Sequence, residues 1–423
     1  MAPAQGRPST ETSAIQPEGR GVTEDEQGPR VATEAESFNP LEDLRSRIAH
    51  WLHIPVEDAD VIDFVLAVYK SNELAGDPLW GHVIDASGGG KTEVLRSLRN
   101  RSDTYFLSGL TEKTLISGYR DPKHPGQDPS LLPKLNGKVL IIKDLSPLLS
   151  MRRESRNVIL AQLRDAYDGF TDQGRGNVGR VSYQSRFSVL AASTLAVDRF
   201  DAIDEELGER SVKFRMRSTH TSDKVQQAIK NVGRDSGMRD EIERAVSRFL
   251  NGLPKGTHNQ QIPDALLQPL TVIADFTAIV RSHVARDRQH NLRYLPRPEV
   301  GTRLGKELAK LLVSLAAVRM KPAPSLQELR TVARVAEDCM PPNRLLVLRA
   351  IRQYGTLRLA DIVRETGLPR TTAAQVLDDL RVVKVINYAT EQIQDPVIEP
   401  PEELWQLHPD WQEKLRDVPF LGP

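Results

Sequence analysis

Cysteine is almost missing from this sequence: Cys339 is the only one among 423 residues. A single thiol cannot form a disulfide within the chain, and it offers none of the repeated spacings of a zinc site. Aromatic residues make up 5% of the chain and hydrophobic residues 39%, a balance that suits a globular protein with helical content. We therefore expect a globular chain without a disulfide framework or a cysteine-based metal site.

Long apolar runs and a net charge are missing as well. No stretch approaches the roughly 20 apolar residues that a membrane helix needs, and the N-terminus has no hydrophobic signal core. Lysine and arginine together number 57, as do aspartate and glutamate, so the formal net charge is zero. We expect a cytoplasmic protein with no membrane partner, in which contact with nucleic acid comes from local basic surface.

Residues 1–40 have almost no large apolar side chains and are rich in Pro, Gly, Glu, Ser and Thr. Burial cannot offset the entropy of ordering such a segment, so we predict a disordered tail. Apolar periodicity begins after it, in the stretches LEDLRSRIAHWLHI and ADVIDFVLAVYKSNEL. These two stretches predict two helices.

The stretch VIDASGGGKTEVLRSL combines a short apolar strand, a glycine-rich turn and a helical pattern, which is the context of a phosphate-binding loop. In such a loop backbone N–H groups point at phosphate, a lysine reaches the outer phosphates and a hydroxyl binds magnesium. The pattern predicts an ATP and Mg²⁺ site formed by Ser87, Gly88, Gly89, Gly90, Lys91 and Thr92, with Thr92 as a metal ligand. A flexible turn with a surface lysine is the alternative. Asp85 departs from the motif, because it stands where the first glycine should be.

A second acid follows another apolar strand pattern, in GKVLIIKDLSPLLS. Asp144 stands where a Walker B aspartate would hold magnesium through water. The next residue is Leu145, not the glutamate that usually polarises the attacking water. Asp85 and Leu145 both argue against efficient hydrolysis.

The order of elements resembles an AAA+ ATPase, in particular the minichromosome-maintenance helicase core and mobile-element ATPases, over about Pro78 to Ala336. The resemblance implies an α/β P-loop core with a helical lid that assembles into an oligomeric ring. It also implies catalytic roles for Thr194 (or Ser193) as the γ-phosphate sensor, Arg210 as a finger toward a neighbouring subunit, and Arg303 as sensor 2. A surface arginine and a helix N-terminal cation are the simpler alternatives for the two arginines.

The glycine- and arginine-rich stretch FTDQGRGNVGRVSYQSR stands where this family has a hairpin that lines the central channel. The resemblance implies that Arg175 and Arg180 meet DNA phosphates there. A solvated basic loop is the alternative.

Three short helical patterns after CMPPNR, followed by VINYATE and LWQLH, resemble a MarR-like winged helix-turn-helix over residues 342–409. The third helix would contact DNA through Arg370, Thr371, Thr372 and Gln375. Asp378 and Asp379 share that helix, and the expected wing EQIQDPVIEPPEEL has five acids and no base. That wing should repel phosphate, which leaves DNA contact to the helix alone; a protein-docking role is the alternative.

Four regions are therefore expected: a disordered tail (1–40), an AAA+ α/β core with preceding helices (41–218), a helical lid (219–340), and a winged helix-turn-helix with an acidic wing (341–423). The expected function is that of an oligomeric ATPase acting on DNA, helicase- or translocase-like, in replication or defence of a mobile element and with a protein partner from that process. The alternative is a nucleotide-binding regulator or docking adaptor that hydrolyses ATP weakly or not at all.

Overall fold

The computed structural model describes residues 38–117, 123, 128–175, 179–199, 210–217, 221–255, 261–389 and 403–422. Residues Pro40–Pro423 form one compact unit, from which Met1–Asn39 is separate. The predicted tail, residues 1–40, lies almost wholly outside the described residues.

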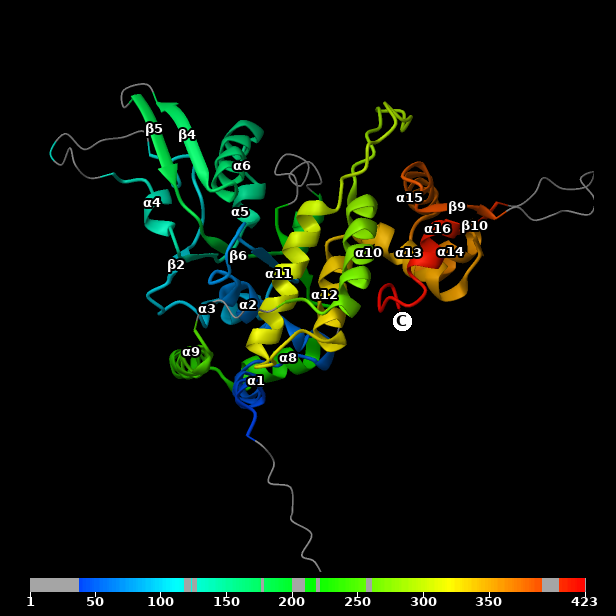
Figure 1. The fold of residues 1–423 in the computed structure, drawn as a ribbon. Coiled ribbons are helices and arrows are strands. Elements are labelled where there is room, and N and C mark those ends of the chain that lie inside the picture. Colours follow the sequence, from blue (N-terminus) through cyan, green and yellow to red (C-terminus); the bar gives the residue numbers. More distant parts are fainter. Residues whose placement is uncertain are drawn as a thin grey trace, which may run out of the picture. The chain divides into compact units, whose positions relative to one another are not determined.

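A parallel sheet of five strands forms the centre of the first part of this unit (Figure 1). Its strands, in spatial order, are β2 (Thr104–Leu107), β3 (Val139–Ile142), β6 (Ser188–Ser193), β1 (Trp80–Ile84) and β7 (Val212–Arg215). All neighbouring strands run parallel, and β1, β3 and β6 are buried at every residue. Burial on both faces explains their almost unbroken apolar sequences, and the α/β class expected from the sequence is confirmed.

The two faces of the sheet pack into different apolar clusters. Alternate residues of β3 belong to different clusters, since Val139 and Ile141 join the first and Leu140 and Ile142 the second. This follows from the period of two along a strand. The surrounding helices are α1 (Pro40–Trp51), α2 (Asp60–Ser71), α3 (Lys91–Arg96), α4 (Leu132–Leu135), α5 (Ser146–Leu149) and α6 (Arg153–Tyr167), with 3-10 turns at Val56–Asp58 and Leu195–Arg199.

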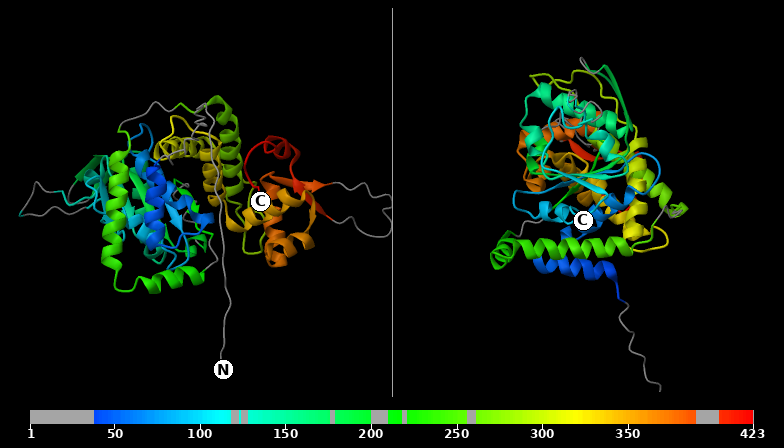
Figure 2. Two further views of the ribbon diagram at one scale, coloured as in Figure 1. Left: turned by 90° about the horizontal axis from the view of Figure 1, so that it is seen from below. Right: turned by 90° about the vertical axis from the view of Figure 1, so that its left-hand side faces the viewer.

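The glycine- and arginine-rich stretch that follows α6 forms a separate two-stranded antiparallel ribbon of β4 (Phe170–Arg175) and β5 (Gly179–Gln184). Helices follow β7: α8 (Thr221–Lys230), α9 (Asp235–Gly252), α10 (Asp264–Arg281), α11 (Thr302–Val318) and α12 (Leu326–Asp338). α11 packs on α2 and on α10 and α12, and Figure 2 shows α9 running alongside α1.

The last part of the chain is built from α13 (Pro342–Tyr354), β8 (Leu357–Arg358), α14 (Leu359–Thr366), α15 (Arg370–Val382), β9 (Ile386–Ala389), β10 (Leu404–Leu407) and α16 (Pro409–Lys414). Its three strands form an antiparallel sheet in the order β8-β10-β9. Gly367, with φ of +69°, ends α14 in the left-handed conformation that glycine adopts without strain. Most of the predicted acidic wing, residues 390–402, lies outside the described residues.

No helix within the described ranges has the length and apolar character needed to cross a membrane.

Candidate functional site

The glycine-rich loop joins the end of β1 to the start of α3. Ala86, Ser87 and Gly88 are exposed, and Gly88 and Gly90 adopt positive φ angles of 81° and 92°. Residues other than glycine rarely adopt positive φ angles, so these two positions depend on glycine. The result is a tight turn of small residues with an open backbone, followed by a helix of 6 residues.

Lys91 folds back across this loop instead of extending into solvent. It is 6% exposed, and its Nζ donates a hydrogen bond to the carbonyl oxygen of Ala86 at 2.9 Å. Burial lowers the pKa of Lys91, while the charges of Asp85 and Asp144 oppose that shift. The lysine is therefore placed between the two acids that the sequence singles out. Thr92 follows it in the first turn of α3 and is half-buried.

Asp85 is 4% exposed and points to the inner side of the loop. Its Oδ1 accepts from the N–H of Ala86 at 2.7 Å, and its Oδ2 has no hydrogen-bond donor among the described residues. The nearest cation is Lys224 on α8, whose Nζ is 3.8 Å from Oδ2. Burial raises the pKa of Asp85, against the opposing charges of Lys224 and Lys91.

Asp85 and Gly89 depend on each other. A Cβ placed on Gly89 would lie 1.5 Å from Oδ2 of Asp85, a distance at which one of the two must move. The Asp85 carboxylate thus fills the space that a side chain at position 89 would need. The departure from the motif at position 85 is matched by a small residue four positions later.

The ends of β3 and β6 meet beside this loop. The Asp144 carboxylate accepts from the N–H of Ser146 at 2.8 Å, and the Ser146 hydroxyl lies 3.4 Å from that of Thr194. Ser193, the other sensor candidate, is fully buried and its hydroxyl lies 2.8 Å from Nε2 of His82 within the sheet. Thr194 is the more accessible of the two sensor candidates.

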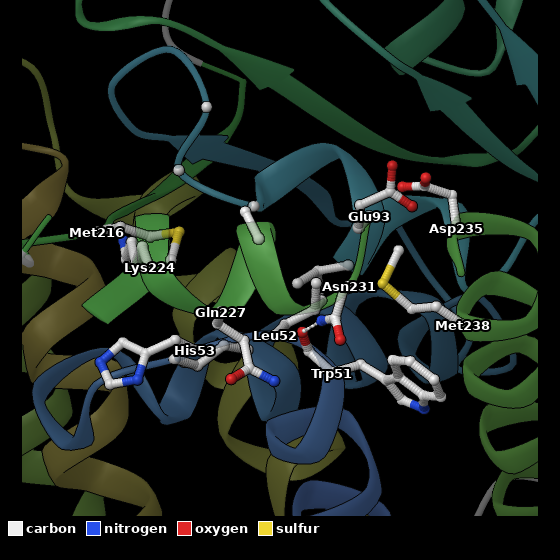
Figure 3. A pocket seen from close by; sticks show the side chains of 16 residues that line it. Trp51, Leu52, His53, Glu93, Met216, Lys224, Gln227, Asn231, Asp235 and Met238 are labelled. Atoms are coloured by element: carbon white, nitrogen blue, oxygen red, sulfur yellow. Dashed lines mark hydrogen bonds between the residues drawn. The ribbon is translucent and has the colours of Figure 1, made fainter. Parts of the chain in front are cut away.

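A pocket of about 210 Å³ lies against Gly88, Gly89 and Gly90. Its other walls come from segment 51–54 at the end of α1, from α8 and from the start of α9. Figure 3 shows Lys224 and Met216 on one side and Glu93 and Asp235 on the other. The apolar lining is Trp51, Leu52, Ile54, Val94, Met216, Ala228 and Met238, and the polar lining includes His53, Gln227 and Asn231.

Sequence reasoning did not identify the residues of this pocket outside the loop. Segment 51–54 was interpreted only as the end of a helix, yet Asn231 donates to the Trp51 carbonyl at 2.8 Å and Gln227 to the His50 carbonyl at 2.7 Å. These two hydrogen bonds connect α8 and the residue that follows it to the end of α1. An apolar pair around a histidine, Leu52 and Ile54, is the only local signal that could have indicated the wall.

Arg210 and Arg303 lie elsewhere, and neither lines this pocket. Arg210 is 8% exposed, forms an ion pair with Asp168 at 3.3 Å, and lies over the Tyr167 ring at 5.5 Å. Burial is the main factor that lowers the pKa of Arg210, and the charge of Arg303 lowers it further. The two arginines are thus neighbours at the junction of α6 and α11, where the Tyr167 hydroxyl donates to Glu307 at 2.8 Å.

Two basic residues, Arg175 and Arg180, were expected to contact DNA from the ribbon of β4 and β5. Arg180 is 79% exposed and forms an ion pair with Asp172 on the facing strand. Arg175 ends β4 opposite Gly179, and its side chain lies outside the described part of the chain.

On α15 the predicted DNA-contacting residues Arg370, Thr371 and Gln375 are exposed, and Thr372 is half-buried. The two acids of the same helix are paired with arginines. Arg286 contacts Asp378 at 2.7 Å and Asp379 at 2.6 Å, Arg344 contacts Asp379 at 3.1 Å, and Arg381 contacts Asp378 at 2.6 Å. The two acids that were expected to oppose DNA phosphates are therefore both held in ion pairs with arginines.

No protein-family model matches this chain, and no curated protein is significantly similar to it.

Proposed function

We propose that this chain is an oligomeric P-loop ATPase of the AAA+ type, which binds ATP with Mg²⁺ and acts on DNA. The observation that carries the proposal is the meeting of three strand ends at one edge of the sheet: the loop Asp85–Thr92 after β1, Asp144 after β3, and Thr194 after β6. β6 lies between β1 and β3. Ligands of parallel α/β sheets bind at this carboxyl edge.

The proposed roles follow from the groups at that edge. Backbone N–H groups of residues 87–90 would surround the phosphates, and Lys91 would exchange the Ala86 carbonyl for β- and γ-phosphate oxygens. A hydroxyl and one carboxylate, from Thr92 and Asp144, suit Mg²⁺, which prefers oxygen ligands and shares them with phosphate. Thr194 would orient the attacking water. When bound, Mg²⁺ supplies charge neutralisation at the transferred phosphate.

The pocket beside the loop favours a nucleotide over free phosphate as the ligand of this site. It is mostly apolar, it begins at the glycines of the loop, and its polar lining includes Gln227 and Asn231, whose amide nitrogens already donate to backbone carbonyls. A purine base needs such apolar walls with a few polar groups. The base would lie between segment 51–54 and α8.

In an assembled ring, Arg210 would act as an arginine finger on the nucleotide of a neighbouring subunit. That role requires Arg210 to leave Asp168, and its distance from this chain's own pocket favours a nucleotide bound by a neighbour. Arg303, beside it, stays the candidate for sensor 2.

The C-terminal part supports action on DNA, which we attribute to a winged helix-turn-helix. Three packed helices and a three-stranded antiparallel sheet leave Arg370, Thr371 and Gln375 of α15 exposed. A helix of this kind enters the major groove with its first turns.

The test of the ATP site is Lys91→Ala, compared with the exposed control Lys134→Ala. We expect Lys91→Ala to abolish measurable ATP binding with an unchanged circular dichroism spectrum, and the control to bind as wild type does. Steady-state ATPase rates with and without single-stranded DNA then test turnover. Unchanged ATP affinity in Lys91→Ala would remove the phosphate-loop assignment.

A second candidate function is a nucleotide-dependent regulator or docking adaptor that does not turn ATP over. It is favoured by Leu145, whose side chain packs against the second apolar cluster and whose N–H donates to the Ala192 carbonyl at 2.8 Å. Position 145 itself therefore provides no carboxylate to polarise water. ATP binding without steady-state hydrolysis would select this function.

A further inference from the structure

The connection between α10 and α11, residues 282–301, carries a concentrated positive charge. We call it the basic arm. Figure 1 shows it extending beyond the adjoining ends of the two helices. Between positions 283 and 297 it contains four arginines and one acid, namely Arg286, Arg288, Arg293, Arg297 and Asp287.

The basic arm has a defined backbone conformation. Arg286 and Leu292 form an antiparallel bridge, and the Arg293 N–H donates to the Ala285 carbonyl at 3.0 Å. The Asp287 carboxylate accepts from the N–H groups of Gln289 and Asn291, both at 2.8 Å. Asp287 therefore closes the turn of the arm.

The positive charge at the surface of the arm is only partly balanced, by the interaction of Arg293 with Asp287. Arg288, Arg293 and Arg297 are exposed, and neither Arg288 nor Arg297 has a hydrogen bond or an ion pair with a described residue. Glu299, the next acid along, is already paired with Arg281 at 2.8 Å. Tyr294, 60% exposed, stands among these arginines.

The base of the arm is fastened to α15. Arg286 holds Asp378 and Asp379 of that helix. Arg344 of α13 donates to the carbonyls of Val280 and Ser282, both at 2.7 Å, and pairs with Asp379. The paired acids of α15 thus serve as the anchor that keeps the arm beside the helix.

We propose that the basic arm is a second DNA-binding element, which holds the phosphate backbone of a duplex whose major groove receives α15. Exposed arginines interleaved with a tyrosine are complementary to phosphates and sugars. The acidic stretch 391–403 cannot provide such contacts, and the arm supplies the positive surface that it lacks. This inference rests on the proposed action on DNA.

The experiment compares two triple variants of the full chain, each with three fewer positive charges. One is Arg288→Gln/Arg293→Gln/Arg297→Gln in the arm. The matched control is Lys230→Gln/Arg248→Gln/Arg330→Gln, at exposed positions on α8, α9 and α12. Duplex affinity is measured by fluorescence anisotropy across a range of salt concentrations, and thermal unfolding checks that both variants fold.

Each lost phosphate contact should make the slope of log K against log salt concentration shallower by about 0.9. We expect a change of about 2.7 for the arm variant, so the affinity lost between about 50 and about 200 mM salt shrinks roughly 40-fold. The control should keep the wild-type slope. Equal slopes in the two variants would overturn the inference.

A further variant separates this inference from the proposed function. If Arg370→Gln weakens duplex binding and the arm variant does not, action on DNA stands and the arm is not part of it. If the wild-type chain does not bind duplex, both fall. If the arm variant keeps duplex binding but loses binding to an acidic protein, the arm docks a protein and the inference is wrong.

Discussion

Two regions of this molecule place acids where a polyanion is expected to bind, and they treat those acids in opposite ways. Asp85 in the glycine-rich loop is buried, with one backbone hydrogen bond and a lysine at 3.8 Å. Asp378 and Asp379 on α15 are bound by arginines at 2.6 to 3.1 Å. Asp85 is therefore a poorly paired buried acid, whereas Asp378 and Asp379 are tightly paired and connect α15 to its neighbours.

From this difference we expect the effect of an acid on a nearby phosphate to depend on its partners more than on its position in a motif. A tightly paired carboxylate presents little net charge and adds rigidity, because guanidinium and carboxylate bind in a fixed geometry. A poorly paired one keeps its charge or takes up a proton. Four tests show how far this contrast holds.

The largest effect is expected for Asp379→Ala in the α15 pair. Removing this acid leaves Arg344, which is 8% exposed, without its carboxylate partner. Breaking a buried ion pair from one side costs roughly 3 to 5 kcal/mol of unfolding free energy. Urea denaturation measures the loss, and Asp410→Ala, at an acid that is 74% exposed, is the control. Similar losses in both variants would show that the α15 pair is not structural.

A buried acid of a third kind extends the comparison. Burial raises the pKa of Glu307 to about 7 from its ordinary 4.5, although Arg281, the Tyr167 hydroxyl and Arg303 act against the shift. The folded state therefore holds an extra proton between these two values, so its stability falls as the pH rises through this window. At 1.36 kcal/mol per pKa unit the decline amounts to about 3 kcal/mol.

Glu307→Gln cannot ionise and should lack this part of the decline. Unfolding free energies of both proteins at about pH 5 and about pH 8 provide the measurement. A wild-type protein whose pH dependence matches that of Glu307→Gln would contradict the assignment.

The loop itself is tested by a double-mutant cycle at positions 85 and 89. Gly89→Ala places a methyl group where the Asp85 carboxylate lies, so we expect at least a tenfold loss of ATP affinity, about 1.4 kcal/mol. Asp85→Gly alone should tighten ATP binding, because it removes a negative charge near the phosphates. In the double variant the methyl group finds empty space and Gly89→Ala should cost little.

Turnover of Asp85→Gly separates two further roles for the acid. Unchanged kcat means that Asp85 is a tolerated departure, which we favour. A collapse of kcat with tighter binding means that it replaces the glutamate missing at Leu145. Additive effects in the double-mutant cycle, or looser ATP binding in Asp85→Gly, would show that the Asp85 carboxylate does not occupy the space beside Gly89.

The smallest effect concerns protonation of Asp85. Because burial raises its pKa, lowering the pH removes its charge sooner than for an ordinary aspartate, and ATP affinity should rise by a few fold as the carboxyl becomes neutral. Asp85→Asn has no such charge to lose. Calorimetric titrations at about pH 5.5 and about pH 8 compare the two proteins, since ATP and other groups titrate equally in both. Parallel pH profiles would refute a role for this carboxyl.

Much of the fold could be predicted from short stretches of sequence. The apolar runs at β1 and β3 and the helices α1, α2, α13, α14 and α15 lie where their patterns place them, because periodicity and turn residues act over a few positions. The glycines at 88 and 90 were likewise predictable, since their conformation is a local property of the turn.

The tertiary structure decided which charges meet. Lys224 faces Asp85, Arg286 faces Asp379, and segment 51–54 forms a pocket wall with α8, all across long intervals of sequence. Such pairs depend on how helices pack against the sheet and against each other, and a charged residue on a helix carries no local mark of its partner. The sequence by itself therefore determined the elements and the candidate phosphate loop. Packing determined whether each acid beside an expected phosphate contact opposes binding or supports the scaffold.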